Sequence, residues 1–199
     1  GLALVLSTLV GVPVGATLGL SQLRARGFIT ALLYTGMGLP PVVVGLFVYL
    51  MLSRSGPFGE LGWLFTPSAM IVAQIIIAFP LVSGLTMAAV QGVDPALRVQ
   101  VRSLGATGPQ EVWAVLREAR LGVVAALVAA FGGIISEVGA VMLVGGNIEG
   151  KTRVLTTAIV LNTRTGEFSL AIALGVILLT LAFVANVAML RLQGFTGEK

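Results

Sequence analysis

Long uncharged apolar runs alternate with short charged segments along the chain. A helix needs about 20 mostly apolar residues to cross the hydrocarbon core of a bilayer. Charged residues are absent from residues 1–23, 27–53, 61–93, 121–136 and 168–190. These runs predict membrane-spanning helices over residues 2–20, 28–52, 68–90, 121–144 and 168–190. Because the runs are continuous and do not alternate with polar residues, the pattern argues against a membrane β-barrel.

The composition supports an all-α integral membrane protein. Apolar residues make up 57% of the 199 residues, charged residues only 10%, and the mean hydropathy is +1.04. A soluble globule cannot hide so much apolar surface, and disordered chains have the opposite composition. We expect residues 1–199 to form one polytopic helical bundle with five spans. The first residue is Gly rather than the initiator Met, so this expectation leaves room for a sixth helix upstream.

Glycine and proline modify three of these helices. Gly11, Gly15 and Gly19 recur every four residues, which places them on one face and predicts the close approach of a neighbouring helix. The Pro40-Pro41 pair breaks the second span, because proline lacks a backbone N–H and clashes with the preceding turn. We expect Pro80 to kink the third span for the same reason.

The residue inventory excludes several kinds of chemistry. The chain has no Cys and no His, which excludes a thiolate nucleophile, a disulfide, His-based acid–base catalysis and a conventional zinc site. The net charge of +4 does not indicate nucleic-acid binding, because no basic stripe with interleaved aromatic residues occurs. We therefore expect a membrane protein that contacts lipid, is not itself an enzyme and binds neither a cofactor nor nucleic acid.

The distribution of basic residues predicts the orientation of the spans. One of the two alternating sets of connections holds eight of them: Arg24, Arg26, Arg98, Arg102, Arg117, Arg120, Arg191 and Lys199. The other set holds four: Arg54, Lys151, Arg153 and Arg164. Connections rich in Lys and Arg face the cytoplasm. We therefore expect a multi-pass protein of the cell membrane with its C-terminus in the cytoplasm.

Residues 91–120, which join the third and fourth predicted spans, contain the end signals of a short helix. Asp94 is a typical N-cap residue, and Pro95 suits the first helical position that follows it. The predicted helix continues through Leu104. Gly105 is expected to end it in the left-handed conformation, because glycine has no Cβ that opposes this geometry.

A second helix is predicted directly after this turn. Gly108 is the expected cap, Pro109 the expected first residue, and Glu111 suits the positive end of the helix. We expect this helix to run through Arg120 into the membrane. The loop is thus a folded element with two helices.

The turn between these two helices resembles the EAA loop of ABC-importer membrane subunits. Residues 102–107 precede a Glu-x-Gly sequence by about thirty residues, as in that family. Residues 99–101 stand where the family has its Glu-Ala-Ala triplet, and residues 117–120 where many members have Leu-Pro, whereas the glycine at the turn is kept. The resemblance implies a type I ABC-importer transmembrane domain in which residues 91–120 are the cytoplasmic coupling loop. It also implies that contacts to the ATPase come from Arg102, Ser103, Leu104, Gly105 and Ala106.

A resemblance to the oxyanion branch of this family covers nearly the whole chain. Residues 39–45, 55–59 and 65–67 are similar to segments of molybdate, tungstate and sulfate permeases. Residues 117–120, 135–140 and 145–148 together are most similar to tungstate-type permeases. The resemblance implies a homodimer around one pathway, a cytoplasmic ABC ATPase dimer that holds ATP and Mg, and an extracytoplasmic oxyanion-binding protein. The expected substrate is tungstate or molybdate.

Residues 145–152 match the phosphate-binding pattern G-x-x-x-x-G-K-[ST]. A functional P-loop follows a buried strand and opens a helix, so that its backbone amides surround phosphate. Here the pattern follows a predicted membrane helix on the outer side, without an acidic Walker B strand. We therefore expect no nucleotide site on this chain. The basic residues Lys151, Arg153 and Arg164 are instead expected to dock the binding protein or simply to be solvated.

Glu137 is the one acidic residue within a predicted span. A carboxylate in the bilayer is costly and is expected to face the bundle interior or a watery cavity. Two interpretations stay open. Glu137 lines a pathway or gate with Pro40, Ser136 and Asn147, or its carboxyl group joins two helices. Because a carboxylate repels an oxyanion, we do not expect it to bind the substrate directly.

Two other classes of protein share this composition, namely a secondary transporter and a structural membrane subunit that is not coupled to ATP. A secondary transporter usually has several intramembrane ionisable residues and a doubled internal repeat, whereas this chain has one such acid. A structural subunit needs no folded cytoplasmic loop. The sequence therefore favours the pathway subunit of an ATP-driven oxyanion importer.

Overall fold

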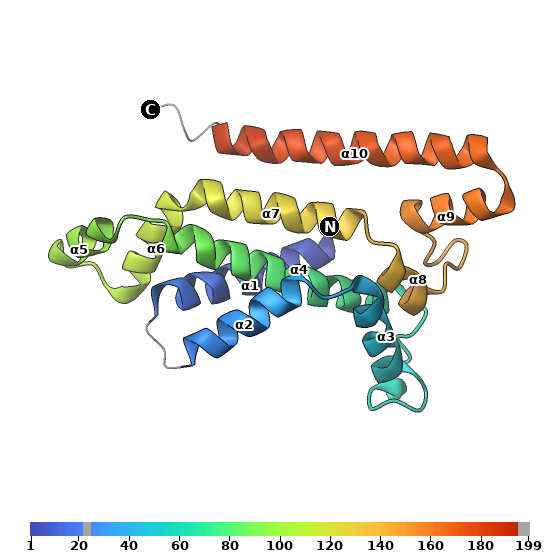
Figure 1. Cartoon of the computed structure of the whole chain (residues 1–199), viewed down its shortest axis with the longest axis horizontal. Helices are drawn as coiled ribbons and strands as arrows, with labels where there is room; N and C mark the ends of the chain where they lie inside the picture. Colours follow the sequence, from blue (N-terminus) through green and yellow to red (C-terminus); the bar gives the residue numbers. More distant parts are fainter. Residues whose placement is uncertain (22–24, 195–199) are drawn as a thin grey trace.

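The computed structural model describes residues 1–21 and 25–194, and the regular structure within these ranges is helical. Arg24 and Lys199, two of the basic residues used to predict the orientation, lie outside the described residues. The helices form an elongated bundle, with α5 and α6 at one end and α3, α8 and α9 towards the other (Figure 1). In chain order the elements are α1 (Leu2–Leu20), α2 (Arg26–Met37), α3 (Pro41–Leu52), η1 (Gly59–Leu61), α4 (Pro67–Gln91), α5 (Pro95–Ser103), α6 (Gly108–Glu118), α7 (Arg120–Ile135), α8 (Gly139–Gly145), α9 (Leu155–Thr165) and α10 (Phe168–Gly194).

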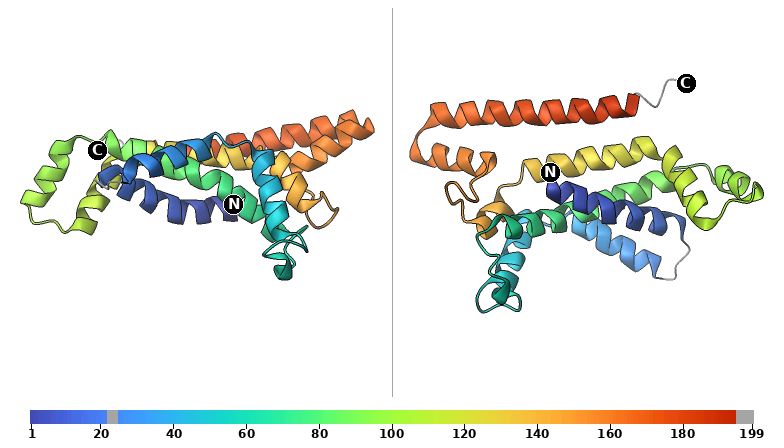
Figure 2. Two further views of the ribbon diagram at one scale, coloured as in Figure 1. Left: turned by 60° about the horizontal axis from the view of Figure 1, so that its bottom comes forward. Right: turned by 180° about the vertical axis from the view of Figure 1, so that it is seen from behind.

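The helix α4 is the centre of the bundle. It packs against α1, α2 and α7, and its N-terminal part also contacts α3 and α8 (Figure 2). On α1, Gly11 and Gly15 face α4 so closely that a Cβ on Gly15 would collide with the backbone oxygen of Ser83. The predicted close approach at this glycine face is therefore confirmed. Pro80 lies inside α4, which continues through it as one helix.

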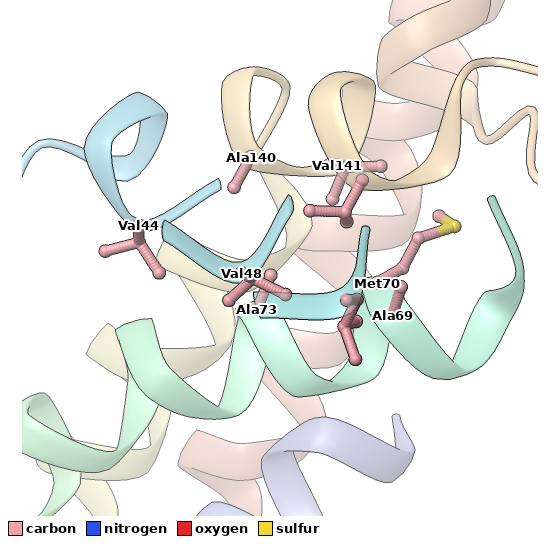
Figure 3. Packing of buried hydrophobic residues seen from close by; sticks show 9 residues of the cluster. Val44, Val48, Ala69, Met70, Ala73, Ala140 and Val141 are labelled. Carbon is pink, nitrogen blue, oxygen red and sulfur yellow. The ribbon is translucent and has the colours of Figure 1, made fainter. Parts of the chain in front are cut away.

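A buried apolar cluster joins α3, α4 and α8 (Figure 3). Its labelled members are Val44 and Val48 of α3, Ala69, Met70 and Ala73 of α4, and Ala140 and Val141 of α8. The backbones of α3 and α8 come close together, since a Cβ on Gly45 would lie 2.6 Å from the Cα of Ala140. This packing holds the short helix α8 against the N-terminal half of α4.

Among the described residues, α1, α4 and α10 are each long and apolar enough to cross a membrane. They correspond to the predicted spans 2–20, 68–90 and 168–190. Two bent pairs raise the number of candidate spans to five. One of them is α2 with α3, which are bent by 101° across the break that ends at Pro41. The predicted interruption at Pro40-Pro41 is therefore confirmed.

The fourth predicted span, residues 121–144, is wrong as a single helix. The helix α7 ends at Ile135, and the separate helix α8 begins at Gly139. The Gly132 carbonyl, in the last turn of α7, accepts hydrogen bonds from both the Ser136 N–H at 3.2 Å and the Ser136 hydroxyl at 2.7 Å. An apolar run conceals such a break, because hydropathy does not report where polar side chains take over backbone hydrogen bonds.

The second loop helix and its cap also differ from the prediction. The helix that begins near Pro109 does not continue straight into the membrane, because α6 ends at Glu118 and α7 departs at 72°. The cap is Thr107 rather than Gly108, and its N–H donates to Oε1 of Gln110 at 2.8 Å. In addition, nothing in the hydrophobic pattern predicts α9.

Candidate functional site

The α5–α6 loop, residues 94–118, has well-defined helix ends. Oδ1 of Asp94 accepts a hydrogen bond from the N–H of Ala96 at 2.8 Å, so the predicted N-cap is confirmed. After α5, Gly105 has a φ of +84°, the predicted left-handed conformation. The N–H of Ala106 donates across this turn to the Val101 carbonyl at 3.1 Å. This pattern satisfies the last carbonyls of α5 and fixes the direction in which the chain leaves it.

Two arginines of α5 hold α6 through one carboxylate. Nε of Arg98 donates to Oε1 of Glu111 at 2.6 Å, and Nε of Arg102 donates to Oε2 at 2.7 Å. Only 8% of the Glu111 side chain is exposed. The hydrogen bonds from Arg102 and then from Arg98 hold the pKa of Glu111 below its ordinary value of 4.5. This Glu111 clamp (Arg98, Arg102 and Glu111) ties the two helices together.

Sequence reasoning missed this clamp. It used Glu111 only as a favourable charge at a helix start and placed Arg102 among the ATPase contacts. The structure gives the Arg102 guanidinium a positioning contact inside the loop. A pattern that could have revealed the clamp is the spacing of Arg98 and Arg102, because residues four apart share one helix face.

The tip of the loop is apolar and exposed. Leu104 is 80% exposed and Val99 is 69% exposed. The neighbouring Ser103 uses its hydroxyl within α5, since it donates to the Gln100 carbonyl at 2.8 Å, and Ala106 is half-buried. An apolar helix tip on a rigid turn can fill a complementary groove on another protein.

Glu137 lies at the start of α8 and is 8% exposed. Its Oε1 accepts a hydrogen bond from the N–H of Ala140 at 2.8 Å, and its backbone carbonyl accepts one from the Thr156 hydroxyl at 3.1 Å. The carboxylate therefore satisfies an N–H group in the first turn of α8. Glu137 also lines a cavity of about 680 Å³ between α4, α7, α9 and α10, together with Gln74, Arg153 and Thr156. Both interpretations of Glu137, a structural cap and a cavity-lining residue, have a geometric basis.

The other candidate gate residues do not line this cavity, as far as the described residues show. Pro40 is exposed and forms the N-cap of α3, whereas Ser136 is exposed at the end of α7. Asn147 has a φ of +50°, and its buried Oδ1 lacks a hydrogen-bond partner among the described residues.

The breaks in the two interrupted spans nevertheless meet. A Cβ on Gly139, at the start of α8, would lie 2.6 Å from Cγ2 of Val42, in the first turn of α3. The α2–α3 break at Pro40 and the α7–α8 break at Glu137 therefore adjoin. Irregular backbone is tolerated at membrane depth only where protein or a water-filled cavity surrounds it.

The loop of residues 145–154, named the outer loop after its predicted side of the membrane, uses backbone N–H groups internally. The Ile148 carbonyl accepts hydrogen bonds from the N–H groups of Lys151, Thr152 and Arg153 at 2.9–3.2 Å. The buried Thr152 hydroxyl donates to the Gly145 carbonyl at 2.6 Å and accepts from the Ile148 N–H at 2.9 Å. A P-loop must direct these amides at phosphate, so this loop does not have the geometry of a phosphate cradle.

The three basic residues proposed to dock a binding protein lie on two different elements. Lys151 is exposed on the outer loop, and Arg153 follows it but pairs with Glu149, whose Oε2 lies 3.3 Å from the arginine Nη1. Arg164 is exposed in the last turn of α9. Lys151 and Arg153 therefore share one short loop, while Arg164 is separate from it.

We compared the sequence and the fold of this chain with those of known proteins. Residues 11–194 match the family described as "Binding-protein-dependent transport system inner membrane component". The "Probable anion ABC transporter permease protein" of Haloferax volcanii is 46% identical, over 92% of this chain and 82% of the relative. The "Tungstate uptake system permease protein TupB" of Peptoclostridium acidaminophilum is 40% identical, over 96% of this chain and 84% of the relative. An inward-facing structure of the MetNI methionine ABC transporter has a TM-score of 0.72 at 18% identity, covering 96% of this chain and 88% of that chain.

The helical bundle, with its bent spans and folded loop, is that of a membrane subunit of a transport system. The family match covers nearly the whole chain, and the relatives are similar along most of their own length. The chain belongs to the family of inner membrane components of binding-protein-dependent transport systems. The predicted all-α, type I ABC-importer fold is confirmed by the similarity to MetNI.

Proposed function

We propose that this chain is the membrane pathway subunit of an ATP-driven importer for an oxyanion, with tungstate as the expected substrate. Membership of the family supports transport that depends on a binding protein. The relative from P. acidaminophilum is named for tungstate uptake, and the relative from H. volcanii for anion transport. Tungstate and molybdate have the same charge and tetrahedral shape, so molybdate is the alternative substrate.

The α5–α6 loop is the proposed contact with a separate cytoplasmic ATPase dimer, which would hold ATP and Mg. The observation that carries this assignment is the exposure of Leu104, which is 80% exposed beside a turn fixed by Gly105 and the Glu111 clamp. We expect Leu104 to enter a groove on the ATPase, with Ser103 and Ala106 beside it. Arg102 acts through Glu111 by positioning the loop.

The α5–α6 loop is packed directly against the spans of the bundle. Val115 of α6 and Ala119, which follows α6, pack in one buried cluster with Ala16 of α1 and Val90 of α4. Because closely packed interiors transmit displacement with little compression, a shift of α6 would move the ends of α1 and α4. The function proposed for the loop is to convert closure of the ATPase into movement of these spans.

We further propose that the loop and the C-terminus face the cytoplasm, while the outer loop faces the binding protein that delivers the anion. Two copies of the chain would enclose one pathway. The exposed surface of α10 supports a second copy of the chain, because only 6% of its apolar 18-residue stretch is buried. Apolar helix surface of this kind is covered by lipid or by another helix.

The proposed gate lies where the two interrupted spans meet, with Pro40 on one side and Glu137 on the other. Glu137 caps α8 and lines the cavity, so a movement of α8 relative to α7 would change the position of its carboxylate. Ser136 and Asn147 flank the two ends of α8. In this proposal the carboxylate shapes the gate and does not bind the anion.

The test is transport by the reconstituted complex. The permease, its ATPase and its binding protein are placed in proteoliposomes, and uptake of tungstate, molybdate and sulfate is measured with ATP or with ADP. We expect tungstate uptake with ATP and none with ADP. Uptake that needs an ion gradient but no ATP would instead support a secondary transporter, and loss of all oxyanion uptake would contradict the proposed substrate class.

A further inference from the structure

The helix α6 has one buried face and one outward face that combines an indole with a basic group. Glu111 and Val115 are buried against the loop and the bundle. Trp113 points the other way, since it is 70% exposed and lies about 200° around the helix from Glu111. Arg117 is exposed four residues after Trp113, which places it on the same side.

The bend at the end of α6 places this outward face at the membrane surface. The axis of α6 departs from that of α7 by 72°, and Figure 2 shows α6 running across the direction of α7. A membrane-spanning α7 therefore leaves α6 close to the plane of the membrane. A hollow of about 460 Å³ opens at the bend and is lined by Leu97, Trp113, Ala114, Arg117, Glu118, Arg120 and Leu121. Leu121, in the first turn of α7, is 58% exposed.

The lining of this hollow has the chemistry of a phospholipid headgroup site. Guanidinium groups bind phosphate oxygens with paired N–H donors, and two arginines, Arg117 and Arg120, line the hollow. Tryptophan concentrates at the level of the headgroups, where its apolar ring and its N–H are both satisfied. The Glu118 carboxylate offsets one of the two cations, which leaves one net positive charge to attract an anionic lipid.

We propose that this hollow binds the phosphodiester headgroup of an anionic phospholipid in the cytoplasmic leaflet. Arg117 contacts the phosphate, the Trp113 indole lies at the headgroup level, and Leu121 packs along the acyl chain. The proposal rests on the orientation given under the proposed function, but it is independent of the substrate and of the ATPase. The bound lipid holds α6 at the membrane surface beside the loop that the ATPase is proposed to move.

Fluorescence quenching by brominated lipids tests this site in the whole chain. Trp63→Phe leaves Trp113 as the reporter, since the 199 residues contain two tryptophans. The variant is placed in phosphatidylcholine nanodiscs that contain equal fractions of either brominated phosphatidylglycerol or brominated phosphatidylcholine. Both leaflets have the same composition, so the result does not depend on orientation or on transport activity.

We expect phosphatidylglycerol to associate with the site about fivefold more strongly than phosphatidylcholine, which is the effect of one net basic charge at an anionic lipid. Arg117→Gln should abolish this preference, and Glu118→Gln should increase it. Arg164→Gln, on α9, is the matched control and should leave the preference unchanged. Equal quenching by the two lipids, or an unchanged preference in Arg117→Gln, would overturn the proposal.

Two further results would also refute it. Release of phosphatidylglycerol by inorganic phosphate at matched ionic strength would identify the site as one for free phosphate. Absence of quenching by either lipid would show that protein covers Trp113. Retained tungstate uptake alongside either result would leave the proposed function intact while removing the lipid site.

Discussion

Arg102 of α5 and Glu111 of α6 are joined by an ion pair in which Nε lies 2.7 Å from Oε2. Arg98 binds the other carboxylate oxygen, so one buried acid ties two helices together. These contacts hold the pKa of Glu111 below its ordinary value of 4.5. A carboxylate with a lowered pKa contributes stability that is present above the ordinary value and is lost as the pH falls through the lowered one.

The first prediction is that Glu111→Gln loosens the α5–α6 loop without unfolding the spans. A spin label on Ser103→Cys reports the order of the tip, because the chain has no other Cys. We expect the parent to stay ordered at neutral pH and at pH 4.5, and to become mobile only at lower pH. In Glu111→Gln the label should be mobile throughout. Glu118→Gln is the control, and identical spectra for the two glutamate variants would contradict the role of the clamp.

The second prediction separates the two roles of Glu137. Glu137→Gln keeps an oxygen that can accept the Ala140 N–H but removes the ionisable carboxyl group, whereas Glu137→Ala also removes the cap. Loss of such a cap costs about 0.5–2 kcal/mol. We expect Glu137→Ala to lower the thermal stability and Glu137→Gln to change transport at near-normal stability. Equal loss of stability and transport in both variants would leave Glu137 with a purely structural role.

The third prediction concerns topology. Thr107 at the start of α6 and Lys151 on the outer loop are both exposed, so Cys at either position should react with a membrane-impermeant maleimide. Thr152 is unsuitable because it is buried and holds the outer loop together. We expect Thr107→Cys to label only from the cytoplasmic side and Lys151→Cys only from outside. Labelling of both from one side would contradict the predicted orientation.

Much of the fold follows from local features of the sequence. Apolar runs identified α1, α4 and α10, and the Pro40-Pro41 pair identified the break between α2 and α3. Capping residues located α5 and the left-handed turn at Gly105 that follows it. These predictions succeeded because proline, glycine and N-cap residues act on the backbone within a few residues of their own position.

The parts that were missed depend on contacts between distant segments. The α7–α8 break is stabilised by the Ser136 and Glu137 side chains and by packing of α8 on α3, which no apolar run reveals. The Glu111 clamp needs α5 and α6 to fold back on one another before Arg98 and Arg102 can reach one carboxylate. The contact of Arg102 with the ATPase, which the family resemblance implies, stays a prediction, because the clamp uses its Nε and leaves 60% of the side chain exposed.

The central claim, that the α5–α6 loop couples the permease to an ATPase, depends on the backbone at Gly105. Its φ of +84° is in the left-handed region, which a residue with a Cβ adopts at a cost of about 1–2 kcal/mol. Apart from Gly105 itself and its two chain neighbours, no described atom lies within 4 Å of where a Cβ would stand. A substitution there therefore changes the backbone preference without a steric clash in this chain, and asparagine, which tolerates this conformation, is the matched control.

The most direct measurement is ATP hydrolysis and tungstate uptake, made on the same proteoliposomes for the parent, Gly105→Asn and Gly105→Val. We expect Gly105→Asn to keep most of its coupled uptake. Gly105→Val should insert into the membrane and form the permease dimer, but either lose the ATPase or hydrolyse ATP without importing tungstate. Normal ATPase binding together with normal uptake in Gly105→Val would contradict the assignment of this loop as the coupling element.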